Sequence, residues 1–250
     1  MSVDVVGSTA YKDQIEETEG SPAWLGAFER FFREFPLVLM GRIALCFADA
    51  ESVPQIALWR IAGDEMVFVA RTGSNKETLA IFQSLYQAFV TYHDKLAGEY
   101  GLGLKGCCWA VDLPRQNIAI EIPELAAGGD GTDGTYVEYL GPDVDLGFRI
   151  SKHVRGGEIM ISLQLANELA GVSEARGLVF GFLGSAVLKG VNFGRPYPLI
   201  SARFEPGAEE TIGASGGARY SINSGTIRLT PAEIRDMARQ FAERTDTASD

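Results

Sequence analysis

Two aspartates stand where a strand meets a turn, and the first of them is Asp4. It lies inside the apolar run Val3-Asp4-Val5-Val6, which breaks into Gly7-Ser8-Thr9. Valine favours an extended backbone, so the run predicts a strand. A carboxylate in a strand is costly to bury unless it is paired or binds a metal ion, and the turn offers N–H and hydroxyl groups to an anion. A plain N-terminal strand ending in a Ser/Thr helix cap explains the same residues.

The second aspartate, Asp64, lies in a Gly-Asp turn between two apolar segments, residues 55–60 and 66–70. Two such segments joined across Gly-Asp predict a β-hairpin, in which Asp64 is an ordinary turn residue. Together with Asp4, however, it would place two carboxylates at adjacent strand ends. Such a pair can hold two divalent cations that polarise a triphosphate and lower the pKa of an attacking hydroxyl.

A third group consists of Asp145 and Arg149, within a segment over residues 143–154 that predicts a helix. Their spacing of four places both side chains on one helix face. An ion pair on a solvated helix is one interpretation. The other is an arginine that stabilises negative charge on a phosphoryl group during transfer.

Composition limits the partners of this chain. Its 250 residues are 46% hydrophobic and 22% charged, which suffices for a substantial core. The net charge of −11 opposes binding to nucleic acid or to an anionic membrane surface. Three cysteines give neither a disulfide framework nor a zinc pattern, and no signal-peptide or membrane-spanning pattern is present. We expect a cytoplasmic protein that binds neither nucleic acid nor membrane.

The elements before residue 55 are partly ambiguous. Residues 12–20 are polar and predict a loop or an exposed helical turn, and Ser21-Pro22 is a helix-start signal. Residues 37–48 fit either a strand or a buried helix. Aromatic residues at helical spacing predict a core or subunit-interface face, made of Trp24, Phe28, Phe31, Phe32 and Phe35.

The rest of the chain alternates strands and helices, which predicts a single-domain α+β sandwich. Residues 126–134 are rich in Gly and Asp and predict a surface loop. We divide the chain into a domain over residues 1–204 and an extension over 205–250 that ends in an amphipathic helix. Further helices are expected over 75–100, 163–170 and 231–244, and further strands over 102–112, 117–122, 158–162, 178–183 and 196–204.

Three motifs in fixed order resemble the catalytic domains of class III nucleotidyl cyclases. They are Asp-x-x-Gly-Ser-Thr from Asp4, a basic residue (Arg60) three before Gly-Asp, and acid-x-x-Gly-x-x-Val-x-x-x-x-Arg from Glu138 to Arg149. Two further stretches, residues 155–162 and 188–191, are also similar to the family. The resemblance runs from Val3 to about Leu199, and each motif is short.

The resemblance implies a role for each matching residue. Asp4, Asp64 and the carbonyl of Val5 would bind two divalent cations, Mn²⁺ or Mg²⁺, and Arg149 would stabilise the transition state. The family works as a head-to-tail homodimer in which the metal acids come from one chain and the catalytic Arg and the base-reading pair from the other. The remaining positions would lie beside the triphosphate (Gly7, Ser8 and Thr9) or read the base (Arg60 and Glu138).

Two departures from the family bear on the substrate. Purine cyclases commonly have Lys or Glu in place of Arg60, and an Asn that positions the ribose in place of Asp145. Arginine is bulky and always a donor, so it suits an acceptor-rich base. The chain is similar in kind to the compact pyrimidine cyclases of bacterial Pycsar anti-phage systems, which implies UTP first and CTP second as substrate.

Other functions stay open on the sequence. An adenylate or guanylate cyclase is one, and a catalytically silent cyclase-like module that only binds a nucleotide is another. An unrelated α+β interaction protein would need three motifs in family order by coincidence. The base, the activating signal, the downstream effector and the roles of the C-terminal helix and of Cys107 and Cys108 are not encoded in any recognisable motif.

Overall fold

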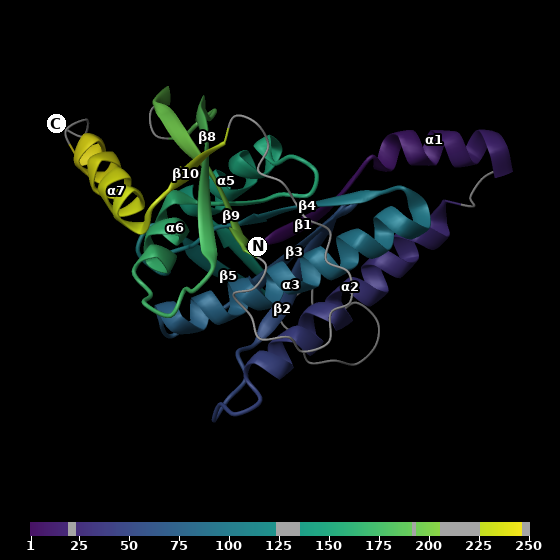
Figure 1. Ribbon diagram of the computed structural model, residues 1–250, viewed down its shortest axis with the longest axis horizontal. Coiled ribbons are helices and arrows are strands. Elements are labelled where there is room, and N and C mark those ends of the chain that lie inside the picture. The colour runs from purple at the N-terminus through teal and green to yellow at the C-terminus, as the bar shows by residue number, and fades with distance from the viewer. Residues whose placement is uncertain (20–23, 124–135, 192–193, 206–225, 247–250) are drawn as a thin grey trace.

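The computed structural model describes residues 1–19, 24–123, 136–191, 194–205 and 226–246 (Figure 1). The strands are β1 (Ser2–Val6), β2 (Ile56–Ala62), β3 (Glu65–Ala70), β4 (Gly103–Cys108), β5 (Ile118–Ile122), β6 (Tyr136–Leu140), β7 (Ile159–Ile161), β8 (Leu178–Val187), β9 (Pro196–Phe204) and β10 (Ile227–Leu229). The helices are α1 (Ser8–Glu19), α2 (Leu25–Cys46), α3 (Asn75–Tyr100), α5 (Pro142–Ile150), the short 3-10 helix η1 (Ser151–His153), α6 (Leu163–Ala170) and α7 (Pro231–Asp246).

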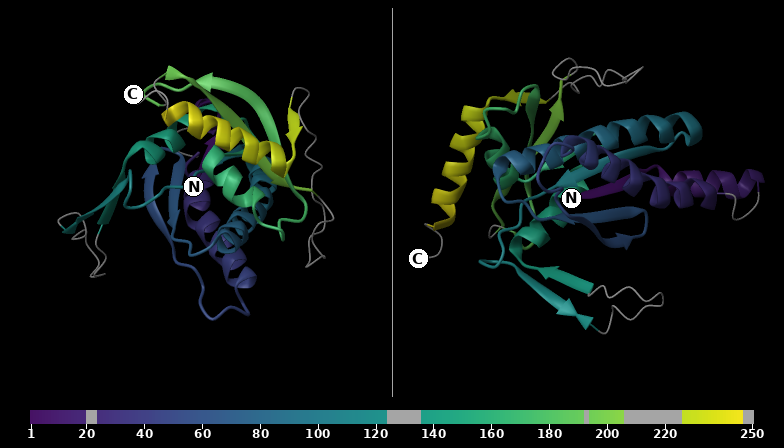
Figure 2. Two further views of the ribbon diagram at one scale, coloured as in Figure 1. Left: turned by 90° about the vertical axis from the view of Figure 1, so that its left-hand side faces the viewer. Right: turned by 90° about the horizontal axis from the view of Figure 1, so that it is seen from below.

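Eight of the strands form one mixed sheet in the order β10-β8-β9-β7-β4-β1-β3-β2, and β5 and β6 pair separately. Helices α2 and α3 lie together on one face of the sheet, while the β5–β6 hairpin projects on the other side (Figure 2). Helices α1 and α7 lie at opposite ends of the molecule (Figures 1 and 2). This mixed architecture confirms the predicted α+β fold.

Strand β1 is an interior strand, third from the β2 edge of the sheet, and pairs antiparallel with β3 and with β4. In this register Asp4 lies opposite Glu65 on one side and opposite Lys105 on the other. Val3 and Val5 are buried on the opposite face from Asp4, as the alternation of a strand requires. Strand β1 therefore presents one acid between two charged neighbours.

The β2–β3 hairpin confirms the predicted turn at Gly63-Asp64, where Gly63 takes a positive φ of 67°. The strand is longer than predicted, because Ile61 and Ala62 still pair with β3. A register shift between Leu58 and Arg60 bends β2 ahead of the turn.

Residues 37–48 were predicted to be either a strand or a buried helix. The structure shows a helix there, because α2 continues through Pro36 to Cys46. Its first half buries the predicted aromatic face, with Phe31 and Phe35 fully covered against Tyr92 of α3. The second half is a helix that is buried on one side, where Leu39 and Ile43 enter the core, and exposed on the other, where Leu37 and Leu45 are each 71% exposed. The helix-start signal at Ser21-Pro22 lies outside the described residues.

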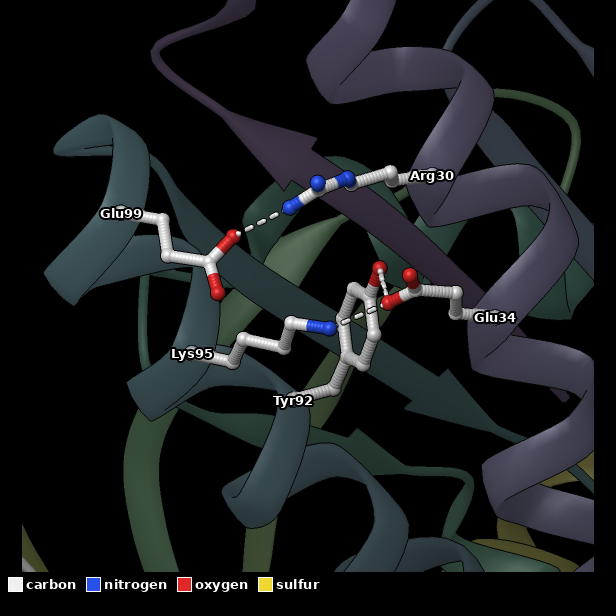
Figure 3. Close-up of polar contacts among 5 residues, drawn as sticks. All are labelled: Arg30, Glu34, Tyr92, Lys95 and Glu99. Carbon is white, nitrogen blue, oxygen red and sulfur yellow. Dashed lines mark hydrogen bonds and ion pairs between the residues drawn. The ribbon is translucent and has the colours of Figure 1, made fainter.

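Polar side chains also join α2 to α3 (Figure 3). Glu34 accepts from the ammonium of Lys95 and, at 3.3 Å, from the hydroxyl of Tyr92. One turn away, Arg30 forms a 3.0 Å ion pair with Glu99. These contacts lie at the solvent edge of the helix pair, above the aromatic core.

Several element bounds differ from the prediction for local reasons. Residues 12–20 fall largely in α1, a helix of 12 residues whose Tyr11 packs on Phe28 and Tyr100. Strand β4 ends at Cys108 rather than residue 112, since the Ala110 amide donates to the side chain of Ser162. The helix expected over 143–154 ends at Ile150 and continues as η1.

Strand β8 runs past its predicted end at residue 183 because the register shifts at Gly184, which has a φ of 118°. Strands β6 and β10 were not predicted as strands. Helices α3 and α6 and strand β9 have the predicted bounds. The adjacent thiols Cys107 and Cys108 are buried in β4, and burial raises the pKa of Cys108 to about 12.

The C-terminal residues join the sheet and pack on α6. Strand β10 pairs with β8, and the predicted capping box holds the start of α7, where Glu233 accepts from the Thr230 amide at 2.7 Å. Arg235 then donates to the carbonyl of Ala170 at 2.8 Å. The predicted loop over 126–134 lies outside the described residues. Among the helices that are described, none has the length and apolar character needed to cross a membrane.

Candidate active site

The carboxylate of Asp4 is engaged by a lysine from the neighbouring strand. Lys105 Nζ lies 2.8 Å from Asp4 Oδ2, and the two side chains are only 30% and 21% exposed. The pairing register places these residues directly opposite each other, so the contact needs no distortion of the sheet. Lys105 was not singled out from the sequence, because the contact depends on which strands pair.

Asp64 approaches Asp4 from the hairpin turn. The pKa of Asp4 is raised, chiefly by burial and further by the negative charge of Asp64, while Lys105 and the Val5 backbone amide oppose the rise. Burial also raises the pKa of Glu65, with Asp4 contributing. The structure thus brings the two predicted metal acids and the main chain of Val5 to one place, with Glu65 as an additional carboxylate.

These residues fit a divalent cation in the nature of their donors. Asp4 and Asp64 offer carboxylate oxygens, which hard cations such as Mg²⁺ prefer, and the negative charge between them is only partly offset. Within the described ranges, no three His, Cys, Asp or Glu side chains gather closely enough to make a metal cluster. Lys105 must also release Oδ2 before a cation can take that oxygen.

The turn after β1 leads directly into a helix. Gly7 has a φ of 86°, which an L side chain would strain, and its carbonyl accepts from the Tyr11 amide at 3.0 Å as α1 begins. Ser8 is half-buried and Thr9 is exposed. The first turn of a helix carries free N–H groups and a partial positive charge, so this turn can accept an anion next to the acids.

Arg60 and Glu138 form an ion pair within the chain, with side chains 32% and 20% exposed. The guanidinium of Arg60 also stacks on the ring of Trp59, 3.9 Å from its centroid. On the other side, the hydroxyl of Tyr136 donates to Glu138 Oε2 at 2.7 Å. The two residues predicted to read the base are therefore adjacent. Their aromatic neighbours, Trp59 and Tyr136, were not singled out from the sequence.

Helix α5 carries Arg149, which is half-buried, and Asp145, which is exposed. No ion pair joins these two side chains in the described part of the chain, so the interpretation as an internal helix pair is not supported. Phe148 packs between the rings of Trp59 and Trp109 at 6.0 and 5.5 Å. Arg149 thus directly follows a residue that contacts Trp59, the ring on which Arg60 stacks.

Two further contacts fix the position of α5. A methyl group on Gly147 would clash with the ring of Trp109, so the helix lies against that ring with only a hydrogen between them. At the start of the helix, the fully buried Asn117 accepts from the Asp143 amide at 3.1 Å and donates to Asp143 Oδ2 at 2.6 Å. Neither Asn117 nor Trp109 was expected from the sequence, since neither belongs to a motif.

The predicted residues therefore fall into two groups. One contains Asp4, Asp64 and the Gly7 turn, and the other contains Arg60, Glu138 and Arg149. Across the ranges that the structure describes, no hydrogen bond or ion pair joins a side chain of one group to a side chain of the other. Each group is internally consistent with binding a different part of a nucleotide.

The sequence itself matches no protein-family model and no curated protein. Among solved structures, the adenylyl cyclase CyaB from P. aeruginosa superposes with a TM-score of 0.51 at 17% sequence identity, covering 84% of this chain and 94% of that one. An adenylate cyclase from Trypanosoma brucei in its monomeric state gives a TM-score of 0.50 at 15% identity, with coverage of 82% and 89%. The fold is that of a class III cyclase catalytic domain.

This cyclase fold also has a hollow at the end of the sheet away from Asp64. Its volume is about 950 Å³, and it opens between β3, the segment after β4 and the start of α6. Phe68, Phe82 and Trp109 make its wall largely apolar, with Arg71 and Glu168 at its edge. None of the predicted site residues lines it, but Trp59, on which Arg60 stacks, and Trp109, which contacts Phe148, do.

Proposed function

We propose that this chain is a nucleotidyl cyclase that converts a nucleoside triphosphate into a 3′,5′-cyclic nucleotide and pyrophosphate. The observation that carries the proposal is the meeting of Asp4 and Asp64 at the end of β1 in a cyclase fold. Arg149, which matches the transition-state arginine of class III cyclases, lies on a helix whose position is fixed by close packing on Trp109. Residues 1–204 form the catalytic domain and residues 205–250 an extension, acting in the cytoplasm.

Asp4, Asp64 and the Val5 carbonyl hold two divalent cations, Mn²⁺ or Mg²⁺. When bound, these ions supply charge that polarises the α-phosphate and lowers the pKa of the ribose 3′-hydroxyl. Gly7, Ser8 and Thr9 bind the triphosphate at the start of α1.

The ribose 3′-hydroxyl gives its proton to solvent water as its oxygen forms a bond to the α-phosphorus, and the bond from that phosphorus to the β-phosphate oxygen breaks, so pyrophosphate leaves. The guanidinium of Arg149 donates hydrogen bonds to the oxygens on which negative charge grows. Asp145, exposed on the same helix, orients the ribose.

The active site is shared between two copies of the chain in a head-to-tail homodimer. The separation of the predicted residues into two groups without a side-chain contact supports this arrangement. Asp64→Ala and Arg149→Ala are each expected to be inactive. Mixing them in equal amounts should restore about a quarter of the activity, since half the dimers are mixed and each has one whole site. No recovery, with subunit exchange confirmed, would argue against sharing.

The substrate is a pyrimidine triphosphate, UTP first and CTP second. Arg60 is a permanent donor, and its ion pair with Glu138 and its stacking on Trp59 leave it fixed beside the place where the base is read. Uracil presents two carbonyl acceptors to such a donor. The product, cyclic UMP or cyclic CMP, serves as an alarm signal for an effector in bacterial anti-phage defence of the Pycsar type.

Incubating the purified protein with each of the four triphosphates and Mn²⁺ tests both the cyclase activity and the preference for a pyrimidine substrate. We expect cyclic UMP as the main product. Cyclic AMP or cyclic GMP would contradict the pyrimidine assignment and retain the cyclase, an outcome favoured by the likeness of the fold to two adenylyl cyclases. Binding of a nucleotide without any cyclic product would indicate a silent cyclase-like module instead.

A further inference from the structure

We infer that Lys105 is an internal cation that occupies the Asp4 carboxylate until a divalent metal ion displaces it, and thereby weakens metal binding. The inference rests on the metal site of the proposed function. Its basis is the 2.8 Å contact between Lys105 Nζ and Asp4 Oδ2, the same carboxylate assigned to the metal ions.

The local balance of charge explains why a cation is needed there. Asp4 interacts electrostatically with Asp64 and with Glu65, so three carboxylates share one region at the end of β1. Lys105 contributes favourable charge to both Asp4 and Glu65, and the N-terminal ammonium contributes to Glu65 as well. Burial removes part of the water that would otherwise screen these acids, which makes the Lys105 ammonium beside Asp4 more important.

Lys105 can leave without disturbing the sheet. Its backbone is fixed opposite Asp4 by the β1–β4 register, whereas its side chain is a flexible stem with a compact charge and three donors. Glu65 lies on the other side of Asp4 and is already within electrostatic reach, so it offers a second acceptor for a displaced ammonium group. A divalent ion supplies twice the charge and takes the oxygen that Lys105 has released.

The test measures Mn²⁺ binding alone, without nucleotide, by the loss of the free-Mn²⁺ electron paramagnetic resonance signal. Lys105→Gln removes the competing cation and should lower the Kd for Mn²⁺ by about tenfold, a typical effect of removing one close charge. Lys95→Gln is the matched control, because it breaks a lysine–carboxylate pair on α2 and α3 and removes the same charge. Its Kd should stay within about twofold of the wild type.

Lys105→Arg provides a second variant that keeps the charge. A guanidinium holds a carboxylate with two donors, so this variant should bind Mn²⁺ no more tightly than the wild type and more weakly than Lys105→Gln. Unchanged or weaker Mn²⁺ binding by Lys105→Gln would overturn the inference. So would an Arg variant that binds Mn²⁺ more tightly than the wild type, even if the Gln variant failed to fold.

Metal binding and product formation are measured separately, so the two proposals fail in different ways. If no triphosphate yields a cyclic product but Lys105→Gln still tightens Mn²⁺ binding, the cyclase proposal fails and the role of Lys105 stands. If cyclic nucleotide forms and Lys105→Gln leaves the Kd unchanged, the inference fails and the cyclase stands. Absence of Mn²⁺ binding in both the wild type and Lys105→Gln overturns the inference.

Discussion

Two of the lysine–carboxylate pairs in the described residues look alike, but the pKa of the carboxylate shifts in opposite directions. Lys95 pairs with Glu34 between α2 and α3, and Lys105 pairs with Asp4 between β4 and β1. The pKa of Glu34 is lowered, with the hydrogen bond from Lys95 as the largest cause. The pKa of Asp4 is raised despite its lysine, because burial outweighs the pair.

The surroundings account for the difference. Glu34 is 36% exposed and has Tyr92 and Arg30 as additional favourable neighbours (Figure 3). Asp4 is less exposed and has another carboxylate, Asp64, as its neighbour. Lys95 and the other neighbours of Glu34 lower the pKa of that acid, whereas Lys105 does not offset the effect of burial on the pKa of Asp4. A carboxylate that still lacks positive charge is a mark of a functional site, and a metal ion would supply that charge.

The largest expected difference is in catalysis. Asp4→Asn removes a proposed metal ligand and should lower cyclic nucleotide formation by about a thousandfold or more, since a bound metal ion contributes several kcal/mol to transition-state stabilisation. Glu34→Gln breaks the outwardly similar pair and should leave the rate within about twofold. The measurement is initial rate with Mn²⁺ and the preferred triphosphate. An Asp4→Asn variant that kept more than a tenth of the rate would remove Asp4 from the site.

Thermal stability in the presence of metal should show the next largest difference. Mn²⁺ at about 100 times its Kd stabilises a folded protein by about 2.7 kcal/mol, which corresponds to a rise in Tm of roughly 5–10 °C for a chain of this size. We expect this rise in the wild type and in Glu34→Gln. Asp4→Asn should show little of it. Equal rises in all three proteins would mean that the ion binds elsewhere.

Without metal, the ionised Asp4 should destabilise the fold. Because its pKa is higher in the folded state than the usual value of 3.8, the folded protein keeps a proton that the unfolded chain has lost over the pH range between the two values. Stability therefore falls as pH rises through the window above 3.8. Asp4→Asn, which leaves Glu65 beside Lys105, should be about 0.5–1 kcal/mol more stable than the wild type at pH 7 in urea unfolding. A loss of stability would show that the Asp4–Lys105 pair is structural.

Glu34 should give the smallest effect and the opposite sign. Its pKa is lower in the folded state, so its contribution to stability is complete above the usual value of 4.5 and is lost as pH falls through the folded pKa. Glu34→Gln should be less stable than the wild type at pH 7 by about 0.3–0.5 kcal/mol, as is usual for a partly exposed pair. The difference should disappear in acid. A difference that persisted at pH 2–3 would point to lost packing rather than lost charge.

Local sequence signals were sufficient for the elements that depend on local physics. Helix α3 repeats its apolar residues at helical spacing and has a capping serine, Ser74, before it, and its bounds were predicted without error. The β2–β3 hairpin follows from a Gly-Asp turn between apolar segments. The signals left residues 37–48 undecided between a strand and a helix, and the structure shows a helix that continues through Pro36 to Cys46.

Elements that depend on distant partners were missed. Strand β10 has only three residues and exists by pairing with β8, while β6 exists by pairing with β5. The same limit applies to the site. Asp4, Arg60, Glu138 and Arg149 were predicted from motif order, but Lys105 becomes visible only when β1 and β4 are placed side by side.

The absence of space between Gly147 and Trp109 has a consequence for how this domain can change over evolutionary time. Any side chain at position 147 would meet the indole, so substitution there is harmful unless the residue at position 109 becomes smaller at the same time. The order of mutations would then matter. Replacing Trp109 by a smaller residue first would make room for a side chain at position 147, whereas replacing Gly147 first would cause the clash. The two positions, far apart in the chain, are expected to vary as a pair.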